Sequence, residues 1–153
     1  MNNGDTHVLV IEADPGDGDL IRQRLVEGDS AVRVSCVNRL AEGLESMAKE
    51  LPSVVLLDLN LPDSPGVDPL HEVIEKAPGV PVVILLGQGE ETQAMNALHD
   101  GAQDYLLKGD ITSSDLERVM HGAIEKQALI RSLALGSYNV NTPAQRLRRL
   151  RTV

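Results

Sequence analysis

The sequence predicts an α/β fold in which five strands form a doubly wound parallel sheet with helices on both faces. The chain shows short continuous apolar runs, apolar residues at helical spacing, and a regular alternation of the two. Uninterrupted apolar runs are typical of strands buried on both faces. Parallel neighbours need a crossover connection, which a helix supplies. With 153 residues, the chain has room for one such domain.

Each strand and helix is marked by its own apolar pattern. Residues 15–18, Pro-Gly-Asp-Gly, are expected to break the chain before the first helix, and residues 112–114, Thr-Ser-Ser, offer an N-cap for the last. The apolar runs predict strands over residues 8–11, 32–36, 54–57, 81–86 and 105–107. Helical spacing predicts helices over residues 20–28, 40–51, 69–74, 94–98 and 116–124, with 129–130 extending the last.

Chemically active side chains follow these strands at one edge of the predicted sheet. Glu12 and Asp14 follow the first strand, Asp58 the third, and Lys108 the fifth. In such sheets ligands bind beyond the carboxyl ends of the strands, where the strand order switches. Clustered carboxylates repel one another unless a cation joins them, and hard oxygen ligands favour Mg²⁺. The arrangement suits Asp58 as the nucleophile that accepts a phosphoryl group, with a metal and Lys108 neutralising charge.

Three stretches resemble the receiver domain of bacterial two-component response regulators. They are residues 8–15 (VLVIEADP), 54–63 (VVLLDLNLPD) and 101–108 (GAQDYLLK), and the likeness covers residues 7–130. The resemblance implies a (βα)5 flavodoxin-like receiver fold. It also implies that Asp58 is phosphorylated from a histidine kinase or a histidine phosphotransfer protein, with Mg²⁺ bound.

The same resemblance implies roles for other residues. Lys108 would pair with the phosphoryl group, and Tyr105 would turn inward or outward as the domain switches. The output face would be the fourth helix, fifth strand and fifth helix, which is often used for homodimerisation. The metal would be held by Glu12, Asp58 and the backbone carbonyl of Asn60.

Two positions depart from the family pattern at the expected site. Ala13 stands where the family has the acid that binds the metal directly, and Asp14 is one place too far along to be a sure replacement. Leu86 stands at the switch position, where the family has a Thr or Ser hydroxyl. Fewer ligand charges lower Mg²⁺ affinity, and an aliphatic side chain offers no hydrogen-bond donor. The milder change is Gly109 in place of a common Pro.

Three functions therefore stay open. The leading hypothesis is a receiver that accepts a phosphoryl group on Asp58, with self-phosphorylation and autodephosphorylation as its only chemistry, so not an enzyme. The alternative is a degenerate receiver that serves as a phosphorylation-independent interaction or dimerisation module, which Ala13 and Leu86 favour. The third, a metal-dependent phosphohydrolase, depends on a faint similarity of Asp58-x-Asn60 to the HAD-like nucleophile motif.

Composition restricts the partners and the compartment. The chain carries 14 basic and 23 acidic side chains, a net charge of −9, and it has no Phe or Trp. An acidic body repels phosphate backbones and anionic membranes, and base-stacking platforms are nearly absent, so neither nucleic acid nor a membrane is an expected partner. No apolar run reaches the ~18–20 residues that a bilayer span needs. We expect a cytoplasmic protein.

The expected organisation is an N-terminal extension over residues 1–6, a receiver domain over 7–130, and a basic C-terminal linker or tail over 131–153. The tail is too short for a DNA-binding output domain, so the chain either works alone or leads a longer protein. Cys36 is the only cysteine, which excludes an intrachain disulfide, and it is expected in the core. All four histidines, His7 among them, are expected on the surface.

Overall fold

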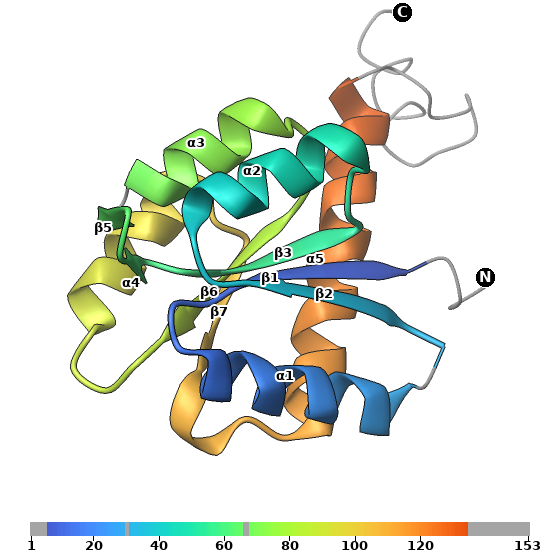
Figure 1. Ribbon diagram of the computed structural model, residues 1–153. Coiled ribbons are helices and arrows are strands. Elements are labelled where there is room, and N and C mark those ends of the chain that lie inside the picture. Colours follow the sequence, from blue (N-terminus) through green and yellow to red (C-terminus); the bar gives the residue numbers. More distant parts are fainter. Residues whose placement is uncertain (1–5, 30, 66–67, 135–153) are drawn as a thin grey trace, which may run out of the picture.

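Five parallel strands form the central sheet in the computed structural model, which describes residues 6–29, 31–65 and 68–134 (Figure 1). The strand order is β2-β1-β3-β6-β7. β2 lies on one side of β1, and the later strands are added on the other side, so the strand order switches between β1 and β3. This confirms the predicted doubly wound sheet. The strands are β1 (His7–Ile11), β2 (Arg33–Val37), β3 (Val54–Asp58), β6 (Val82–Leu86) and β7 (Asp104–Leu107).

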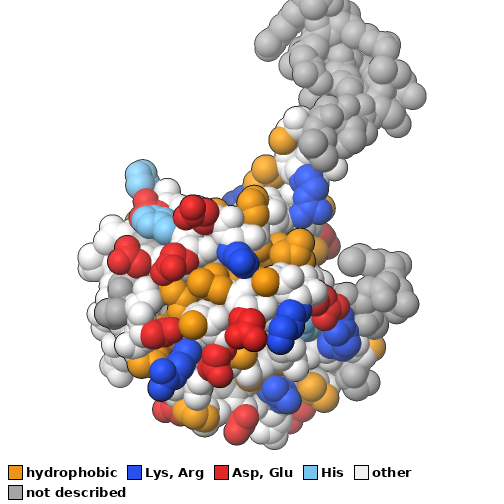
Figure 2. Space-filling view, turned by 45° about the horizontal axis from the view of Figure 1, so that its top comes forward, with side chains coloured by type: hydrophobic (Ala, Val, Ile, Leu, Met, Phe, Trp, Pro, Cys, Tyr) orange, Lys and Arg blue, Asp and Glu red, His pale blue; other side chains and the backbone are white. Residues whose placement is uncertain are grey.

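The helices lie in two layers, one on each face of the sheet (Figure 1). The helices are α1 (Pro15–Gly28), α2 (Leu40–Lys49), α3 (Asp68–Lys76), α4 (Glu91–His99) and α5 (Ser113–Ala134). α1 and α5 cover one face, and α2, α3 and α4 cover the other. Seen with the top of Figure 1 turned forward, the surface carries acidic and basic side chains interspersed with exposed apolar ones (Figure 2).

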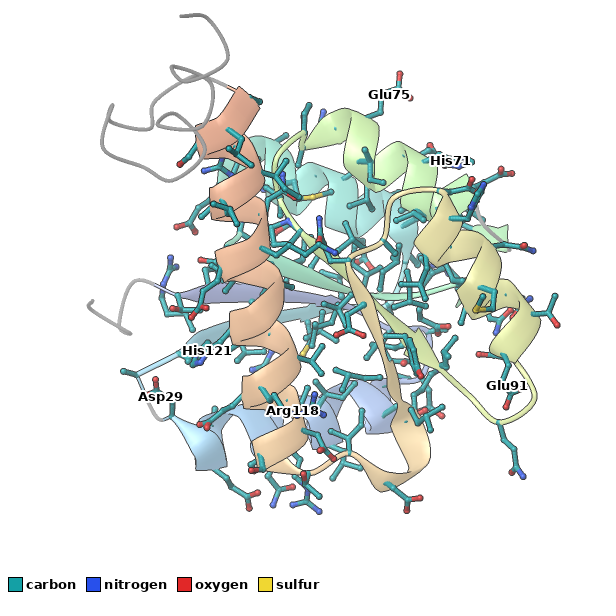
Figure 3. The ribbon with its side chains drawn as sticks, turned by 180° about the vertical axis from the view of Figure 1, so that it is seen from behind. Asp29, His71, Glu75, Glu91, Arg118 and His121 are labelled. Atoms are coloured by element: carbon teal, nitrogen blue, oxygen red, sulfur yellow. The ribbon has the colours of Figure 1, made fainter. Side chains whose placement is uncertain are left out.

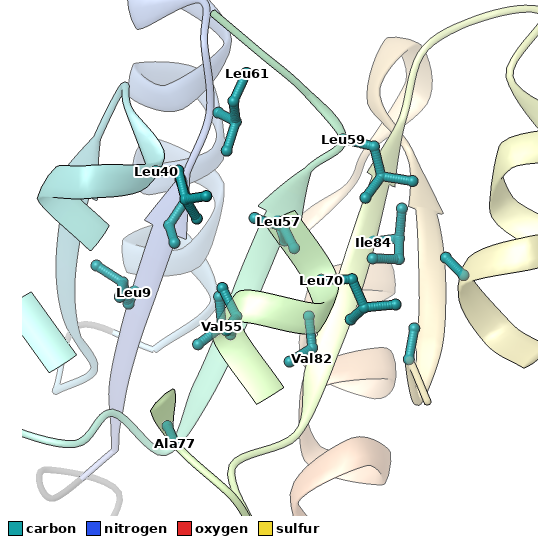
Figure 4. Close-up of a cluster of buried hydrophobic side chains, with 14 of the residues drawn as sticks. Leu9, Leu40, Val55, Leu57, Leu59, Leu61, Leu70, Ala77, Val82 and Ile84 are labelled. Atoms are coloured by element: carbon teal, nitrogen blue, oxygen red, sulfur yellow. The ribbon is translucent and has the colours of Figure 1, made fainter. Parts of the chain in front are cut away.

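Each face of the sheet has its own hydrophobic core, because successive residues of a strand point to opposite sides. On the side of α2, α3 and α4, Leu9 and Leu57 of neighbouring strands share a cluster with Leu40 and Leu70 of the helices (Figure 4). On the other side, Val8 and Val10 belong to a second cluster with residues of α1 and α5. Every residue of β1, β3 and β6 is buried, which holds the ends of these strands in fixed positions.

The first helix begins earlier than the sequence suggests. The expected break at residues 15–18 is wrong, because these residues form the first turn of α1. Asp14 is the N-cap: its Oδ1 accepts the N–H groups of Gly16, at 2.8 Å, and of Asp17, at 3.4 Å. Pro15 follows at the first helical position, where a missing N–H costs nothing.

Other boundaries also differ from the predicted ones. The loop after β3 contains a short antiparallel pair, β4 (Asn60–Leu61) and β5 (Ser64–Pro65). α5 continues to Ala134, four residues into the segment expected as a tail, and residues 135–153 lie outside the described residues. At the N-terminal end of the described residues, the carbonyl of Thr6 accepts the N–H of Arg33. Hydrogen bonding with β2 therefore begins one residue before β1.

His7 is buried, with 5% of its surface exposed, so the expected surface position is wrong for this histidine. Its Nε2 lies 2.8 Å from Oγ of Ser35 on the neighbouring strand. Burial, and then the charge of Arg33, lower the pKa of His7, although the carboxylate of Glu50 opposes this shift. The ring is therefore held in its neutral form, beside Ser35 and close to the charged pair of Arg33 and Glu50. Cys36 is half-buried, a free thiol packed against the α1 and α5 core.

Close packing of α2 on β1 predicts opposite effects for two Gly→Ala substitutions. A Cβ at Gly43 in α2 would lie 2.9 Å from Cγ1 of the buried Ile11, whereas a Cβ at Gly122 in α5 would meet nothing within 4 Å. We expect Gly43→Ala to lower the free energy of unfolding by about 1–3 kcal/mol through overpacking. Gly122→Ala should raise it by up to about 1 kcal/mol through helix propensity. Urea unfolding curves of both variants test this, and equal shifts would contradict it.

Candidate functional site

Asp58 lies at the end of β3, in the middle of the sheet, and only 1% of its surface is exposed. Both of its carboxylate oxygens accept backbone hydrogen bonds. Oδ1 accepts the N–H of Asn60 at 2.9 Å, and Oδ2 accepts the N–H of Ala13 at 3.1 Å. The side chain is thus fixed by the two chain segments that leave β1 and β3, at the switch in strand order.

Glu12 follows β1 and brings a second buried carboxylate to the same edge, with 2% of its surface exposed. The ammonium of Lys108, in the 3₁₀ turn η2 (Lys108–Asp110) after β7, lies between the two acids. Its Nζ is 3.1 Å from Oε1 of Glu12 and 3.5 Å from Oδ2 of Asp58. The structure therefore brings together Glu12, Asp58 and Lys108, three of the residues predicted from the sequence.

The two carboxyl groups differ in their affinity for a proton. Burial, and next the hydrogen bond with Asp58, raise the pKa of Glu12 to about 7. Burial also acts to raise the pKa of Asp58, but hydrogen bonds from Glu12, Asn60 and Ala13 and the charge of Lys108 outweigh it, so the net shift is downward. Near neutral pH the negative charge of the pair therefore resides mainly on Asp58.

Lys108 keeps its charge in this environment. Burial opposes the charged form, but the carboxylates of Asp58 and Glu12 more than offset burial and raise the pKa of Lys108. The site thus combines an ionised carboxylate, a second carboxyl group that titrates near neutrality, and a permanent cation. A carboxylate held beside a fixed cation is suited to nucleophilic attack on a phosphorus atom, because the cation neutralises charge that develops during transfer.

The residues around Asp58 fit a divalent cation with few protein ligands. Glu12 and Asp58 offer carboxylate oxygens, and Asn60 offers a backbone carbonyl. Oε1 of Glu12 is buried, and it lies 3.1 Å from the ammonium of Lys108. Within the described ranges, no three His, Cys, Asp or Glu side chains are close enough to hold a metal by themselves. This donor set suits Mg²⁺, which keeps several water ligands in proteins.

Asp14 and the two predicted switch residues are not brought to this cluster. Asp14 is exposed and caps α1, although its backbone N–H donates to Oε2 of Glu12 at 3.1 Å. Leu86 is 2% exposed and belongs to the core on the α2, α3 and α4 face. Tyr105, on the edge strand β7, has 44% of its surface exposed. Asp14 thus has a capping role, and its role as a metal ligand stays a prediction.

Two acidic residues outside the predicted set have structural roles at this edge. Asp63 accepts the N–H groups of Leu40, at 2.9 Å, and Ala41, at 3.0 Å, and these bonds lower its pKa. It therefore caps α2 from the loop after β3. Glu90, in the loop between β6 and α4, accepts the Gly87 N–H on one oxygen, and its other oxygen accepts the side-chain amide of Asn60. No sequence pattern marked Glu90 beyond an acid just before a helix.

The strand order and this pocket define a flavodoxin-like α/β domain of the receiver class, with a buried aspartate facing a lysine at the switch point. The profile of the response regulator receiver domain matches residues 8–121. The chain belongs to this family, and its place is in two-component signalling.

Proteins similar to this chain include longer regulators. LuxO, a regulatory protein of Vibrio cholerae, is 34% identical over 101 residues, which are 66% of this chain and 22% of LuxO. KdpE, the KDP operon transcriptional regulatory protein of Escherichia coli, is 36% identical over 103 residues, 67% of this chain and 44% of KdpE. The chain thus spans less than half the length of these relatives.

A solved structure supports the fold. The crystal structure of a response regulator receiver domain protein from Clostridium thermocellum matches with a TM-score of 0.73 at 28% identity, covering 82% of this chain and 98% of that one. The signal receiver domain of a LuxO repressor protein from Vibrio parahaemolyticus matches with a TM-score of 0.72 at 23% identity. In the part of this chain that the structure describes, no helix is both long and apolar enough to cross a membrane.

Proposed function

We propose that the chain is a phosphoacceptor receiver in which Asp58 takes a phosphoryl group from a histidine kinase or a histidine phosphotransfer protein. Receiver domains interact with these two kinds of partner and typically bind Mg²⁺. The observation that carries the proposal is the buried Asp58 side chain held 3.5 Å from the ammonium of Lys108. We assign the chain no turnover of free substrates beyond the phosphorylation and dephosphorylation of its own Asp58.

In the proposed transfer, a carboxylate oxygen of Asp58 attacks the phosphorus atom of phosphohistidine. A P–O bond forms as the P–N bond breaks, and the electron pair of that bond returns to the imidazole ring. The N–H groups of Ala13 and Asn60 hold Asp58 for the attack, and Lys108 pairs with the transferred oxygens. Glu12, Asp58 and the Asn60 carbonyl would hold Mg²⁺, which would supply further positive charge to the phosphoryl oxygens.

Substitution of the acceptor tests this function directly. Incubation with acetyl phosphate and Mg²⁺ should add about 80 Da, one phosphoryl group, to the intact mass. Asp58→Asn should abolish the adduct, because an amide is a poor nucleophile. Asp63→Asn is the matched control from the same loop, since Asn also caps helices, and it should label normally.

Other outcomes of the same assay would contradict the proposal. If saturating Mg²⁺ gives no adduct, the chain acts as a phosphorylation-independent interaction module. We do not propose that module, because Asp58 and Lys108 are both in place and its support is confined to Ala13 and Leu86. If organic phosphates release phosphate over many turnovers, the chain is a phosphohydrolase instead.

Ala13 limits the affinity for Mg²⁺ in this proposal. Its side chain is half-buried beside Asp58, whose Oδ2 accepts the Ala13 N–H. An added carboxylate should strengthen binding, because ligand charge count tunes cation affinity. We expect Ala13→Asp to lower the Mg²⁺ concentration for half-maximal labelling by about tenfold. Ala13→Asn has the same shape without the charge and should change it much less; equal effects of the two variants would contradict this explanation.

We also propose that a second copy of the chain docks on the α4, β7 and α5 face. β7 is an edge strand of the sheet, and α4 and α5 flank it on opposite faces. Three large apolar side chains on this face are exposed: Met95 by 67%, Leu107 by 53% and Tyr105 by 44%. Apolar side chains grouped at an edge strand are a recurrent feature of contact surfaces.

Sedimentation equilibrium tests the dimer. We expect the chain to self-associate after labelling with acetyl phosphate, and Leu107→Lys to weaken association at least tenfold, because a charge would be buried in the contact. Val26→Lys places the same charge on α1, where Val26 is 43% exposed, and should leave association unchanged. A purely monomeric labelled protein would exclude this surface as a dimer interface.

A further inference from the structure

The loop between β6 and α4, residues 87–90, is closed by the side chain of its last residue. Oε1 of Glu90 accepts the N–H of Gly87 at 2.7 Å, and the carboxylate lies directly against the Gly87 backbone. Gly89 has a φ of +84°, a left-handed conformation that turns the chain back and that glycine adopts without strain. Glu90 is half-buried, so this contact is partly shielded from water.

The side chain of Glu90 does not cap the helix that follows it. It is the N-cap residue of α4, yet its side chain makes no capping hydrogen bond. Oε2 instead accepts a hydrogen bond from the side-chain amide of Asn60, in the segment that follows β3. A carboxylate with both oxygens engaged, one on each of two loops, joins those loops to each other.

This bridge ends at the phosphoacceptor. The backbone N–H of Asn60 donates to Oδ1 of Asp58, so three hydrogen bonds link Asp58 to Asn60, Asn60 to Glu90, and Glu90 to Gly87. Asp58 pairs with Leu85 in the sheet register, which puts Gly87 just beyond the same edge. Leu86, between them, is buried in the core. Among the described residues, Glu90 is thus the only hydrogen-bonded link between this loop and the end of β3.

We propose that Glu90 is a positioning residue, a carboxylate latch that holds the β6–α4 loop on the phosphoacceptor segment and releases it when Asp58 is phosphorylated. The inference depends on the proposed function. An aspartyl phosphate brings additional negative charge and three strong acceptor oxygens to this edge. The new charge repels the Glu90 carboxylate, and its oxygens compete for the same N–H donors of Gly87 and Asn60.

The latch supplies a way for the loop to respond although Leu86 has no hydroxyl. A hydroxyl would draw the loop toward the phosphoryl group, whereas Glu90 is pushed away from it. Both the attraction and the repulsion give the loop different contacts in the unmodified and the phosphorylated protein. The latch also restrains the unmodified protein. Asp58 has only 1% of its surface exposed, so a phosphodonor reaches it only if a neighbouring segment moves, and the bridged loop borders it.

Variants of Glu90 and of its neighbour test the latch. Glu90→Ala removes the bridge, and Glu90→Gln weakens it, because an amide nitrogen cannot accept one of the two donated bonds. Glu91→Ala is the matched control: Glu91 is exposed, one position further along, and lies at the outer edge of the molecule (Figure 3). The whole chain is used, first without a phosphodonor and then with acetyl phosphate and saturating Mg²⁺.

Two readouts separate the latch from the phosphorylation itself. Without phosphodonor, amide hydrogen exchange at Gly87 should become about tenfold faster in Glu90→Ala and less so in Glu90→Gln. With acetyl phosphate, the initial rate of labelling of Asp58 should rise several-fold in the same order, because the loop opens more often. Glu91→Ala should match the unaltered protein in both. Asn60→Ala breaks the bridge from the other side, and combining it with Glu90→Ala should add nothing further.

Each remaining result overturns the inference. If Gly87 exchange is unchanged in Glu90→Ala, the bridge does not hold the loop. If exchange rises but the labelling rate stays that of the unaltered protein, the bridge exists without restraining Asp58, and the proposed function survives. If Glu91→Ala acts like Glu90→Ala, the effect comes from general charge rather than from the latch. If exchange rises but no variant is labelled, the proposed function fails and the switching role fails with it.

Discussion

The ion-pair cluster of Lys108 with Glu12 and Asp58 is the interaction on which the site depends. Two carboxyl groups, each at most 2% exposed, lie at the ends of adjacent strands, where their mutual repulsion and loss of hydration are unfavourable. The Lys108 ammonium and the N–H groups of Ala13 and Asn60 offset that cost. The two carboxyl groups are affected differently: the pKa of Glu12 is raised, whereas that of Asp58 is lowered, so Asp58 keeps the negative charge. Sheet order imposes this geometry, because it places the ends of β1 and β3 side by side.

The acidic residues at this edge fall into two groups with different structural roles. Glu12 and Asp58 face each other and the lysine, whereas Asp14 caps α1, Asp63 caps α2 and Glu90 joins two loops. A capped helix begins at a fixed residue, so the capping acids fix where the chain leaves and re-enters the sheet. Three of the acids at this edge therefore hold loops and helix starts, and Glu12 and Asp58 are left for a cation.

The sequence predicts the strands and the central cluster well for a physical reason. A strand buried on both faces must be apolar throughout, so a charged residue directly after it, such as Asp58, marks both the strand end and a side chain at the sheet edge. Features decided by contacts between distant segments are not predictable in this way. Nε2 of the buried His7 meets Oγ of Ser35 on the neighbouring strand, and Glu90 meets Asn60, only in the folded chain. The start of α1 is different, because the Asp14 cap is a local contact.

In the function that we propose, Leu86 would change the way the switch works without removing it. A ligand or modification shifts a conformational equilibrium only by the difference between its interactions with the two states. With an aliphatic side chain buried at the switch position, no attractive contact of that side chain can favour the phosphorylated state. Part of the difference would then come from contacts that the unmodified state has and the modified state loses. The bridge from Glu90 to Gly87 and Asn60 is such a contact, and in the proposed latch its N–H donors would turn to the phosphoryl oxygens. Attraction gained and attraction lost are equivalent in the equilibrium, so under the proposed latch the core would keep Leu86 while the loop still responded to charge on Asp58.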